Sequence, residues 1–165
     1  MNTIFITGGN GYIGKRLVAL LSSEFTITVF DCTCPEIKIH GVTYISDNLS
    51  NINIYADIVN QHSIIIHLAS TSLPNNFNPL KDCENDIANT IQLLQCISKN
   101  TKISQFIYFS SGGAIYGPHN SKRIESSLIA PISSYGIVKH TNELYCNLFS
   151  KKHGFNLLIA RPSNI

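Results

Sequence analysis

Thr7-Gly8-Gly9-Asn10-Gly11-Tyr12-Ile13-Gly14 is the stretch that decides the fold of this chain. The apolar run Ile4-Phe5-Ile6 precedes it and an amphipathic segment follows it, which is the order strand, glycine turn, helix. Glycine at positions 8, 11 and 14 suits a backbone that turns tightly, lets a pyrophosphate approach the first helical N–H groups, and packs the helix closely on the strand. The G-x-x-G-x-x-G spacing is one residue wider than the commoner dinucleotide fingerprint, so a glycine-rich loop without a ligand is the alternative.

The composition indicates one globular domain over residues 1–165. Hydrophobic residues make up 44% of the chain and charged residues 13%, with a formal net charge of +2. Such a length buries roughly 70% of its unfolded surface. The small charge favours neither nucleic acid nor an anionic membrane as a partner, and the apolar runs are far shorter than a bilayer span. Because Met1 leads straight into a strand rather than a signal peptide, we expect a soluble, cytoplasmic protein.

The five cysteines are scattered and odd in number, which is typical of a reducing compartment rather than of a disulfide framework. Cys32 and Cys34 are close enough in sequence to hold a metal ion. However, the sequence has no second pair and no histidine cluster at ligand spacing. We therefore expect ordinary thiols and no metal site.

Strand and helix patterns alternate along the chain. Apolar runs predict strands at 2–7, 26–30, 42–45, 64–69, 105–109 and 156–160. Helical patterns are expected at about 12–23, 51–60, 80–99 and 132–153, with loops at 32–41 and 74–79. This alternation predicts an α/β fold, namely a doubly wound parallel sheet (Rossmann fold) with right-handed crossovers and helices on both faces.

Two apolar stripes are assigned to the helices by their spacing. Leu17, Leu20 and Leu21 form the stripe of the first helix. The stripe of the long helix at about 80–99 consists of Ile87, Ile91, Leu94 and Ile97. We expect the second stripe to face the core, with a partner subunit as the alternative.

Asp31 ends the second predicted strand, 17 residues beyond Gly14. A carboxylate at that strand tip can accept hydrogen bonds from both ribose hydroxyls of the adenosine half of NAD. A 2′-phosphate would meet like charge there, so the sequence favours NAD over NADP. A solvated aspartate in a turn is the alternative.

Tyr135 and Lys139 are the candidate acid–base pair. They are four residues apart, so both project from one face of a helix, near the strand ends at which ligands bind in such sheets. A fixed ammonium favours the phenolate form of a neighbouring tyrosine and brings it nearer the working range of a base. Because the same spacing is common on helix surfaces, its position in the fold carries the interpretation.

With these motifs in order, the chain resembles the extended short-chain dehydrogenase/reductase superfamily, in its branch of NAD-dependent nucleotide-sugar epimerases and dehydratases. Besides the glycine turn and Asp31, the resemblance rests on His67-Leu68-Ala69, Thr90 with Leu93-Leu94, the strand end at 110–117, Tyr135-Gly136-Ile137-Val138-Lys139 and Arg161-Pro162-Ser163-Asn164. It implies a tightly held NAD and a nucleotide-sugar substrate of the UDP-hexose type. It further implies that Tyr135 takes a sugar hydroxyl proton while hydride leaves the same carbon for the nicotinamide.

The resemblance also assigns site residues. Catalytic roles fall to Tyr135, Lys139 and Ser111. Cofactor binding falls to Gly8, Gly11, Tyr12, Ile13, Gly14, Asp31, Asp47, Leu68, Ala69 and Lys139, which would bind the nicotinamide ribose. In family members the helices matched by 80–99 and 132–153 often form a four-helix contact, which implies a homodimer.

The chain departs from the family pattern at three positions. Gly112 stands where relatives usually place the catalytic Ser or Thr. Either Ser111 supplies the catalytic hydroxyl, or the site has no such hydroxyl. Asp86, adjoining Asn85, replaces the asparagine found four residues before the threonine matched by Thr90. Asn48 follows Asp47 where an apolar residue is usual.

Family members continue past Arg-x-x-Asn into a smaller domain that grips the sugar nucleotide, whereas this chain ends at Ile165. The sequence thus predicts an NAD-binding domain truncated before the substrate domain, and three functions remain open. The first is a nucleotide-sugar 4-epimerase, and the second is a non-catalytic NAD-binding module. The third is a 4,6-dehydratase or reductase, ranked lowest because Gly113 and Ala114 replace the Asp-Glu pair of the dehydratases.

Overall fold

The computed structural model describes residues 2–75, 77–118 and 120–163. Within these ranges one parallel sheet contains β1 (Thr3–Thr7), β2 (Thr26–Asp31), β3 (Thr43–Ser46), β4 (Ile64–His67), β5 (Gln105–Phe109) and β6 (Asn156–Ala160). The strand order is β3-β2-β1-β4-β5-β6, so it reverses between β1 and β4. The predicted α/β fold with a doubly wound parallel sheet is therefore confirmed, and the reversal marks the place where such sheets bind ligands.

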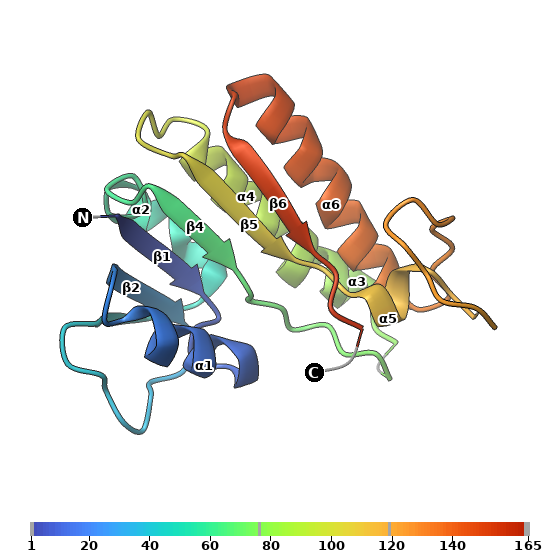
Figure 1. Cartoon of the computed structure of the whole chain (residues 1–165), viewed down its shortest axis with the longest axis horizontal. Coiled ribbons are helices and arrows are strands. Elements are labelled where there is room, and N and C mark those ends of the chain that lie inside the picture. The colour runs from blue at the N-terminus through green and yellow to red at the C-terminus, as the bar shows by residue number, and fades with distance from the viewer. Residues whose placement is uncertain (1, 76, 119, 164–165) are drawn as a thin grey trace.

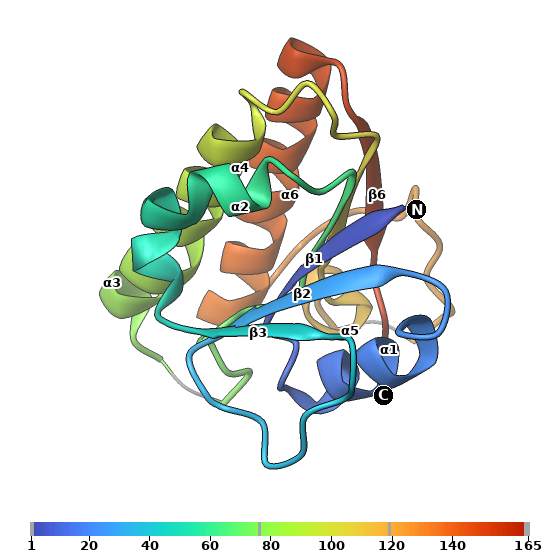
Figure 2. The ribbon, with the colours of Figure 1, turned by 90° about the vertical axis from the view of Figure 1, so that its left-hand side faces the viewer.

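Helices lie on both faces of the sheet. They are α1 (Tyr12–Leu21), α2 (Ala56–Val59), α3 (Pro79–Asp82), α4 (Ala88–Ile97), α5 (Gly112–Ile115) and α6 (Ser134–His153), with a 3₁₀-helix η1 (Leu49–Tyr55) and a π-helix η2 (Cys83–Ile87). Figures 1 and 2 show α1 on one face and α2, α4 and α6 on the other. In the described part of the chain, no helix is both long and apolar enough to cross a membrane.

The core consists of two apolar layers, one on each side of the sheet. On the α1 side the buried residues are Ile4, Ile6, Val18, Ile27, Val29 and Ile66. The opposite layer includes Phe5, Phe30, Ile65, Leu93, Leu94, Ile97 and Phe106. Successive residues of β1 point alternately into the two layers, and this explains why its apolar run is continuous.

The segment predicted as a helix at 51–60 is mostly a 3₁₀-helix, and only 56–59 is α-helical. Its start is held by short-range bonds, since the Asn48 side chain accepts from the Ser50 nitrogen and the Asn48 carbonyl accepts from the Asn51 nitrogen. Asn and Ser side chains compete in this way with the α-helical ladder. Such local competition is invisible to the apolar spacing used for the prediction.

The helix predicted at 80–99 is continuous in space but changes its winding, because the π-helix η2 separates α3 from α4. Its buried side carries Asp82, Asp86 and Thr90 followed by Leu94, a spacing of four that the wide π turn accommodates. The predicted stripe is therefore only partly right: Leu94 and Ile97 are buried, whereas Ile87 and Ile91 are half-buried.

The stripe predicted for the first helix also needs correction. Leu20 is 71% exposed, and Val18 is the buried side chain of α1, with Leu17 and Leu21 half-buried. Val18 lies over the layer formed by β1, β2 and β4, so the helix is rotated relative to the leucine pattern. The sequence also gave no indication of the short helix α5.

Candidate functional site

The turn between β1 and α1 requires glycine at two positions. Gly8 has a φ of +72°, and a Cβ there would lie 2.6 Å from the backbone nitrogen of Ala69. A Cβ on Gly14 would lie 2.5 Å from the carbonyl oxygen of Gly8. The turn thus packs backbone against backbone, and this leaves the start of α1 accessible.

The N-terminus of α1 is suited to bind an anion. Gly11 is the N-cap and has no side chain with which to cap the helix. The first helical hydrogen bond runs from the Lys15 nitrogen to the Gly11 oxygen, at 3.0 Å. The N–H groups of Tyr12, Ile13 and Gly14 therefore precede the helical ladder, and together with the helix dipole they favour a negative group such as a diphosphate.

Two cavities meet at this turn. The first, about 370 Å³, lies toward β2 and β3, and the second, about 520 Å³, lies toward β5 and α6. Gly8, Gly11, Leu68 and Ser70 line both cavities. The first cavity also contains Asp31, Asp47 and Ala69, and the second contains Tyr12, Ile13, Gly14, Ser111, Tyr135 and Lys139. The structure thus brings all the predicted site residues to these two cavities, while their roles stay predictions.

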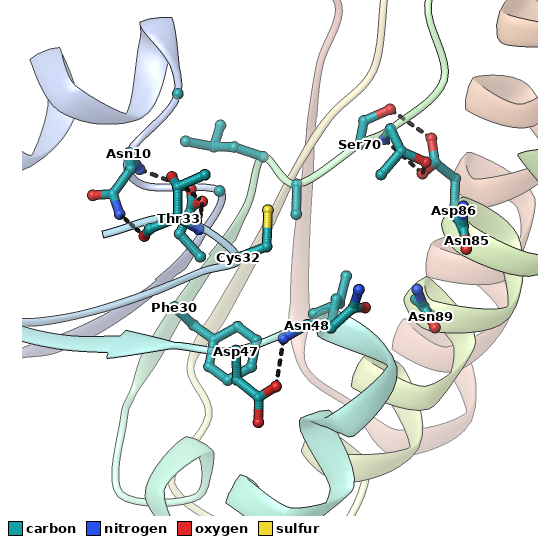
Figure 3. Close-up of a pocket in the computed structure, with 17 residues that line it drawn as sticks. Asn10, Phe30, Cys32, Thr33, Asp47, Asn48, Ser70, Asn85, Asp86 and Asn89 are labelled. Carbon is teal, nitrogen blue, oxygen red and sulfur yellow. Dashed lines mark hydrogen bonds between the residues drawn. The ribbon is translucent and has the colours of Figure 1, made fainter. Parts of the chain in front are cut away.

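The Asp31 carboxylate is held in a fixed position at the edge of the first cavity. Its Oδ2 accepts a hydrogen bond from the Asn10 nitrogen at 2.9 Å. Its Oδ1 accepts from the nitrogen and the hydroxyl of Thr33 at 2.9 and 2.8 Å (Figure 3). Asp31 thereby joins the glycine turn to the end of β2, and its Oδ2, which accepts a single hydrogen bond, retains a lone pair for a ligand.

Asp47 lines the same cavity, but its carboxylate is used within its own segment. It accepts hydrogen bonds from the Asn51 amide at 2.9 Å, the Tyr55 hydroxyl at 2.8 Å and the Asn48 nitrogen at 2.7 Å. These three hydrogen bonds lower the pKa of Asp47 below its ordinary value, and the one from Asn51 has the largest effect. Asn48, at which the chain departs from the family pattern, thus takes part in these hydrogen bonds, because its N–H donates to Asp47.

Lys139 is buried at the base of the second cavity and is 5% exposed. Its Nζ donates to the Phe109 carbonyl at 3.2 Å and lies 5.6 Å from the ring centroid of Tyr135. Burial lowers the pKa of Lys139 to about 8, against the opposing influence of the Asp86 charge. The predicted pair is therefore together at one cavity wall, with the ammonium largely removed from water.

The backbone explains why position 112 is glycine. A Cβ on Gly112 would lie 2.7 Å from the Arg161 oxygen, and the Gly112 nitrogen donates to the Pro162 oxygen at 2.9 Å. Ser111, half-buried at the N-cap of α5, lines the second cavity. Sequence reasoning gave no role to Ser110, which also lines this cavity. Its hydroxyl oxygen is buried and has no hydrogen-bond partner among the described residues.

Other residues at the first cavity were not predicted as site residues. They are Asn10, Phe30, Cys32, Thr33, Asn48, Leu49, Ser70, Thr71, Asn85, Asp86 and Asn89. Figure 3 shows Asp86 and Ser70 next to each other on one side of the cavity, with Asn10 and Thr33 on the other side. Of these, Asn48 and Asp86 gave a sequence signal, through their departures from the family pattern.

A family model described as NAD dependent epimerase/dehydratase family matches residues 4–165. The chain belongs to this family. This epimerase/dehydratase family member is 32% identical to the dTDP-4-dehydro-6-deoxyglucose reductase of Escherichia coli, covering 99% of this chain and 55% of that protein. The chain spans about half the length of the curated relatives it matches.

Solved structures of epimerases have the same fold as this family member. The UDP-glucose 4-epimerase of Thermotoga maritima, solved with UDP-glucose, aligns with a TM-score of 0.84 and 27% identity over 96% of this chain and 54% of that chain. The UDP-N-acetylglucosamine 4-epimerase of Methanobrevibacter ruminantium aligns with a TM-score of 0.87 and 25% identity over 97% and 54%. The predicted family and its resemblance to epimerases are confirmed at this level.

Proposed function

We propose that this chain binds NAD across the two cavities and supplies the acid–base half of a nucleotide-sugar 4-epimerase. The observation that carries the proposal is that the two cavities adjoin at the first turn of α1, where Gly8, Gly11, Leu68 and Ser70 line both. The membership of an NAD-dependent family and the likeness to UDP-sugar epimerases support the same reading.

The residues present fit the cofactor. The close backbone packing at Gly8 and Gly14 leaves the N–H groups of Tyr12–Gly14 available for the diphosphate. Asp31 would accept a hydrogen bond from a hydroxyl of the adenosine ribose, and Leu68 and Ala69 would line the path of the dinucleotide. When bound, NAD supplies a hydride acceptor at its nicotinamide ring.

The protein's own chemistry would be proton transfer. Tyr135, as the phenolate, would take the proton of a sugar hydroxyl at its phenolic oxygen and later return it. The Lys139 ammonium beside the ring would stabilise that phenolate electrostatically. Ser111 would hydrogen-bond the reacting hydroxyl from the cavity wall.

A non-catalytic NAD-binding module is the second candidate. It is favoured by the glycine at position 112, where the Arg161 carbonyl fills the space of a side chain. This alternative expects NAD to bind with the same residues and expects no sugar-nucleotide turnover.

Two measurements separate these possibilities. Calorimetric titration of the purified chain with NAD should show one site in either case, and absence of binding would contradict both. The second measurement uses the full-length form with NAD and a panel of UDP-hexoses. The epimerase should give the 4-epimer of one of these sugars, and Tyr135→Phe should lower that rate at least about 100-fold. NAD binding without product formation would favour the module.

A further inference from the structure

Asp86 is a buried carboxylate that accepts hydrogen bonds from three consecutive residues. It lies in the π-helical turn η2 and is 5% exposed. Its Oδ2 accepts from the Ser70 hydroxyl at 2.6 Å and from the Ser72 nitrogen at 3.1 Å. Its Oδ1 accepts from the nitrogen of Thr71 at 2.8 Å and from the hydroxyl of the same residue at 3.0 Å. Both oxygens are thus saturated by donors from one short segment.

The segment Ser70–Ser72 lies where the two cavities adjoin. Ser70 lines both, Thr71 lines the first and Ser72 lines the second. The segment follows the end of β4, directly after Leu68 and Ala69, and Figure 3 shows the bond from Ser70 to Asp86. A shift of this segment would therefore change the lining of both cavities at the place where a dinucleotide would cross from one to the other.

The backbone of Asp86 is fixed from the other side. Its carbonyl accepts from the Thr90 hydroxyl at 2.6 Å and from the Asn142 amide at 3.4 Å. Thr90 Oγ1 in turn lies 3.0 Å from Nε2 of His67, the last residue of β4. The carboxylate is therefore held on a rigid support formed by α4, α6 and β4, rather than on a mobile loop.

The hydrogen-bond pattern suits a carboxylate and does not suit an amide. All four groups that point at Asp86 are donors, and an Asn side chain would present its NH₂ group to two of them. Burial raises the pKa of Asp86, but the hydrogen bonds from Ser70, Thr71 and Ser72 lower it further, and the net direction is downward. The aspartate in place of the family asparagine thus matches the donors of this particular segment.

We propose that the Asp86 carboxylate is a positioning group. It holds Ser70–Ser72 in the conformation in which this segment lines both cavities, and so preorganises the chain for the dinucleotide. This inference rests on the proposed binding of NAD. It assigns to Asp86 no contact with the reacting atoms.

The test compares Asp86→Asn with the wild-type chain and with Glu84→Gln. Glu84 is exposed in the same π-helical turn, so its substitution makes the same charge change away from the segment. NAD affinity is measured by calorimetry, and exchange of the Thr71 and Ser72 amide hydrogens is measured by NMR. If the variant keeps the segment in place only about a tenth of the time, its apparent Kd for NAD rises about tenfold.

We expect Asp86→Asn to weaken NAD binding about tenfold and to expose both amides to exchange, with Glu84→Gln like the wild type. Ser70→Ala, which leaves the buried carboxylate in place, should weaken binding in the same direction if Asp86→Asn does not fold. Unchanged NAD affinity or unchanged amide exchange in the variants would overturn the proposal. A wild-type chain that does not bind NAD would contradict the proposed function itself, and amide exchange would still decide whether Asp86 holds the segment.

Discussion

His67, at the end of β4, is bonded through one ring nitrogen to the end of β1 and through the other to helix α4. Thr90 Oγ1 donates to the Asp86 carbonyl, so it accepts from the Nε2–H of His67. The other nitrogen, Nδ1, then accepts from the Thr7 hydroxyl at 2.6 Å. This arrangement requires a neutral imidazole, and burial together with the charge of Lys139 lowers the pKa of His67 to about 3.

The first prediction concerns acid stability. Because the folded pKa of His67 is about 3 and its ordinary value is 6.5, the unfolded chain binds more protons between these pH values. Stability should therefore fall as the pH drops below 6.5, by about 1.4 kcal/mol per pH unit from this residue. Urea denaturation of the wild type and His67→Gln at pH 7, 6 and 5 measures the difference in slope. Parallel slopes would contradict the assignment, and His62, whose pKa is also lowered, is common to both proteins.

At this scale the sequence predicted the glycines and Asp31 but not the polar contacts. The need for glycine at positions 8 and 14 follows from local geometry, which the motif contains. The bonds of Asp86 and His67 join residues 14 to 60 positions apart, and such pairs cannot be recognised before the strands are placed.

Among the elements, β6 is attached to α6 by a buried ion pair. Arg161 donates from Nε to Glu143 Oε1 at 2.9 Å and from Nη2 to Glu143 Oε2 at 2.6 Å. Its Nη1 donates to the Tyr116 hydroxyl at 2.9 Å, so the segment after α5 is held by the same guanidinium. The Glu143 side chain is 2% exposed, so this bidentate contact provides the compensation for its burial.

The second prediction concerns this ion pair. Arg161→Ala should lower the free energy of unfolding by roughly 3 kcal/mol, because it leaves the Glu143 carboxylate buried without its partner. Urea denaturation measures the loss. The double variant Arg161→Met with Glu143→Leu should lose less than Arg161→Ala alone, since no charge is stranded. Equal losses in the two proteins would contradict this explanation.

The elements themselves were predicted to different extents. The boundaries of α6 follow from its caps, since Ser133 accepts from the Gly136 nitrogen and Gly154 takes a φ of +79°. The 3₁₀-helix at 49–55 and the π-helix at 83–87 were missed. Both segments carry side-chain hydrogen bonds, from Ser50 to Asn48 and from Thr71 to Asp86, which do not enter a hydrophobic pattern.

Over the whole molecule, α6 presents an apolar surface that nothing in the described chain covers. Ile137, Leu144 and Leu148 are 52%, 57% and 57% exposed. Their separations of seven and four residues place them along one side of the helix. This surface agrees with the homodimer contact implied by the family resemblance.

The third prediction is that the chain self-associates through this side of α6. Sedimentation velocity should detect a dimer, and Leu144→Glu should weaken it at least about tenfold. Leu20→Glu is the matched control, because Leu20 is 71% exposed but lies on α1. A monomeric wild type, or equal dimerisation of the two variants, would contradict the prediction.

The fold class and the meeting of site residues were predicted because each motif stands at the end of a strand or at the start of a helix. In a parallel α/β sheet these positions share one edge, so Asp31 and Tyr135 line adjoining cavities although they are 104 positions apart. The lining at the place where the two cavities adjoin was not predictable, because it depends on Ser70–Ser72 and their hydrogen bonds to Asp86.

The most direct test of dinucleotide binding at this cleft is a crystal structure of the chain grown with NAD. We expect the diphosphate within hydrogen-bond distance of the N–H groups of Tyr12–Gly14 and a hydroxyl of the adenosine ribose on Asp31. The nicotinamide should lie in the second cavity beside Tyr135 and Lys139. A cleft without nucleotide at saturating NAD, or a nucleotide bound elsewhere on the molecule, would contradict the central claim.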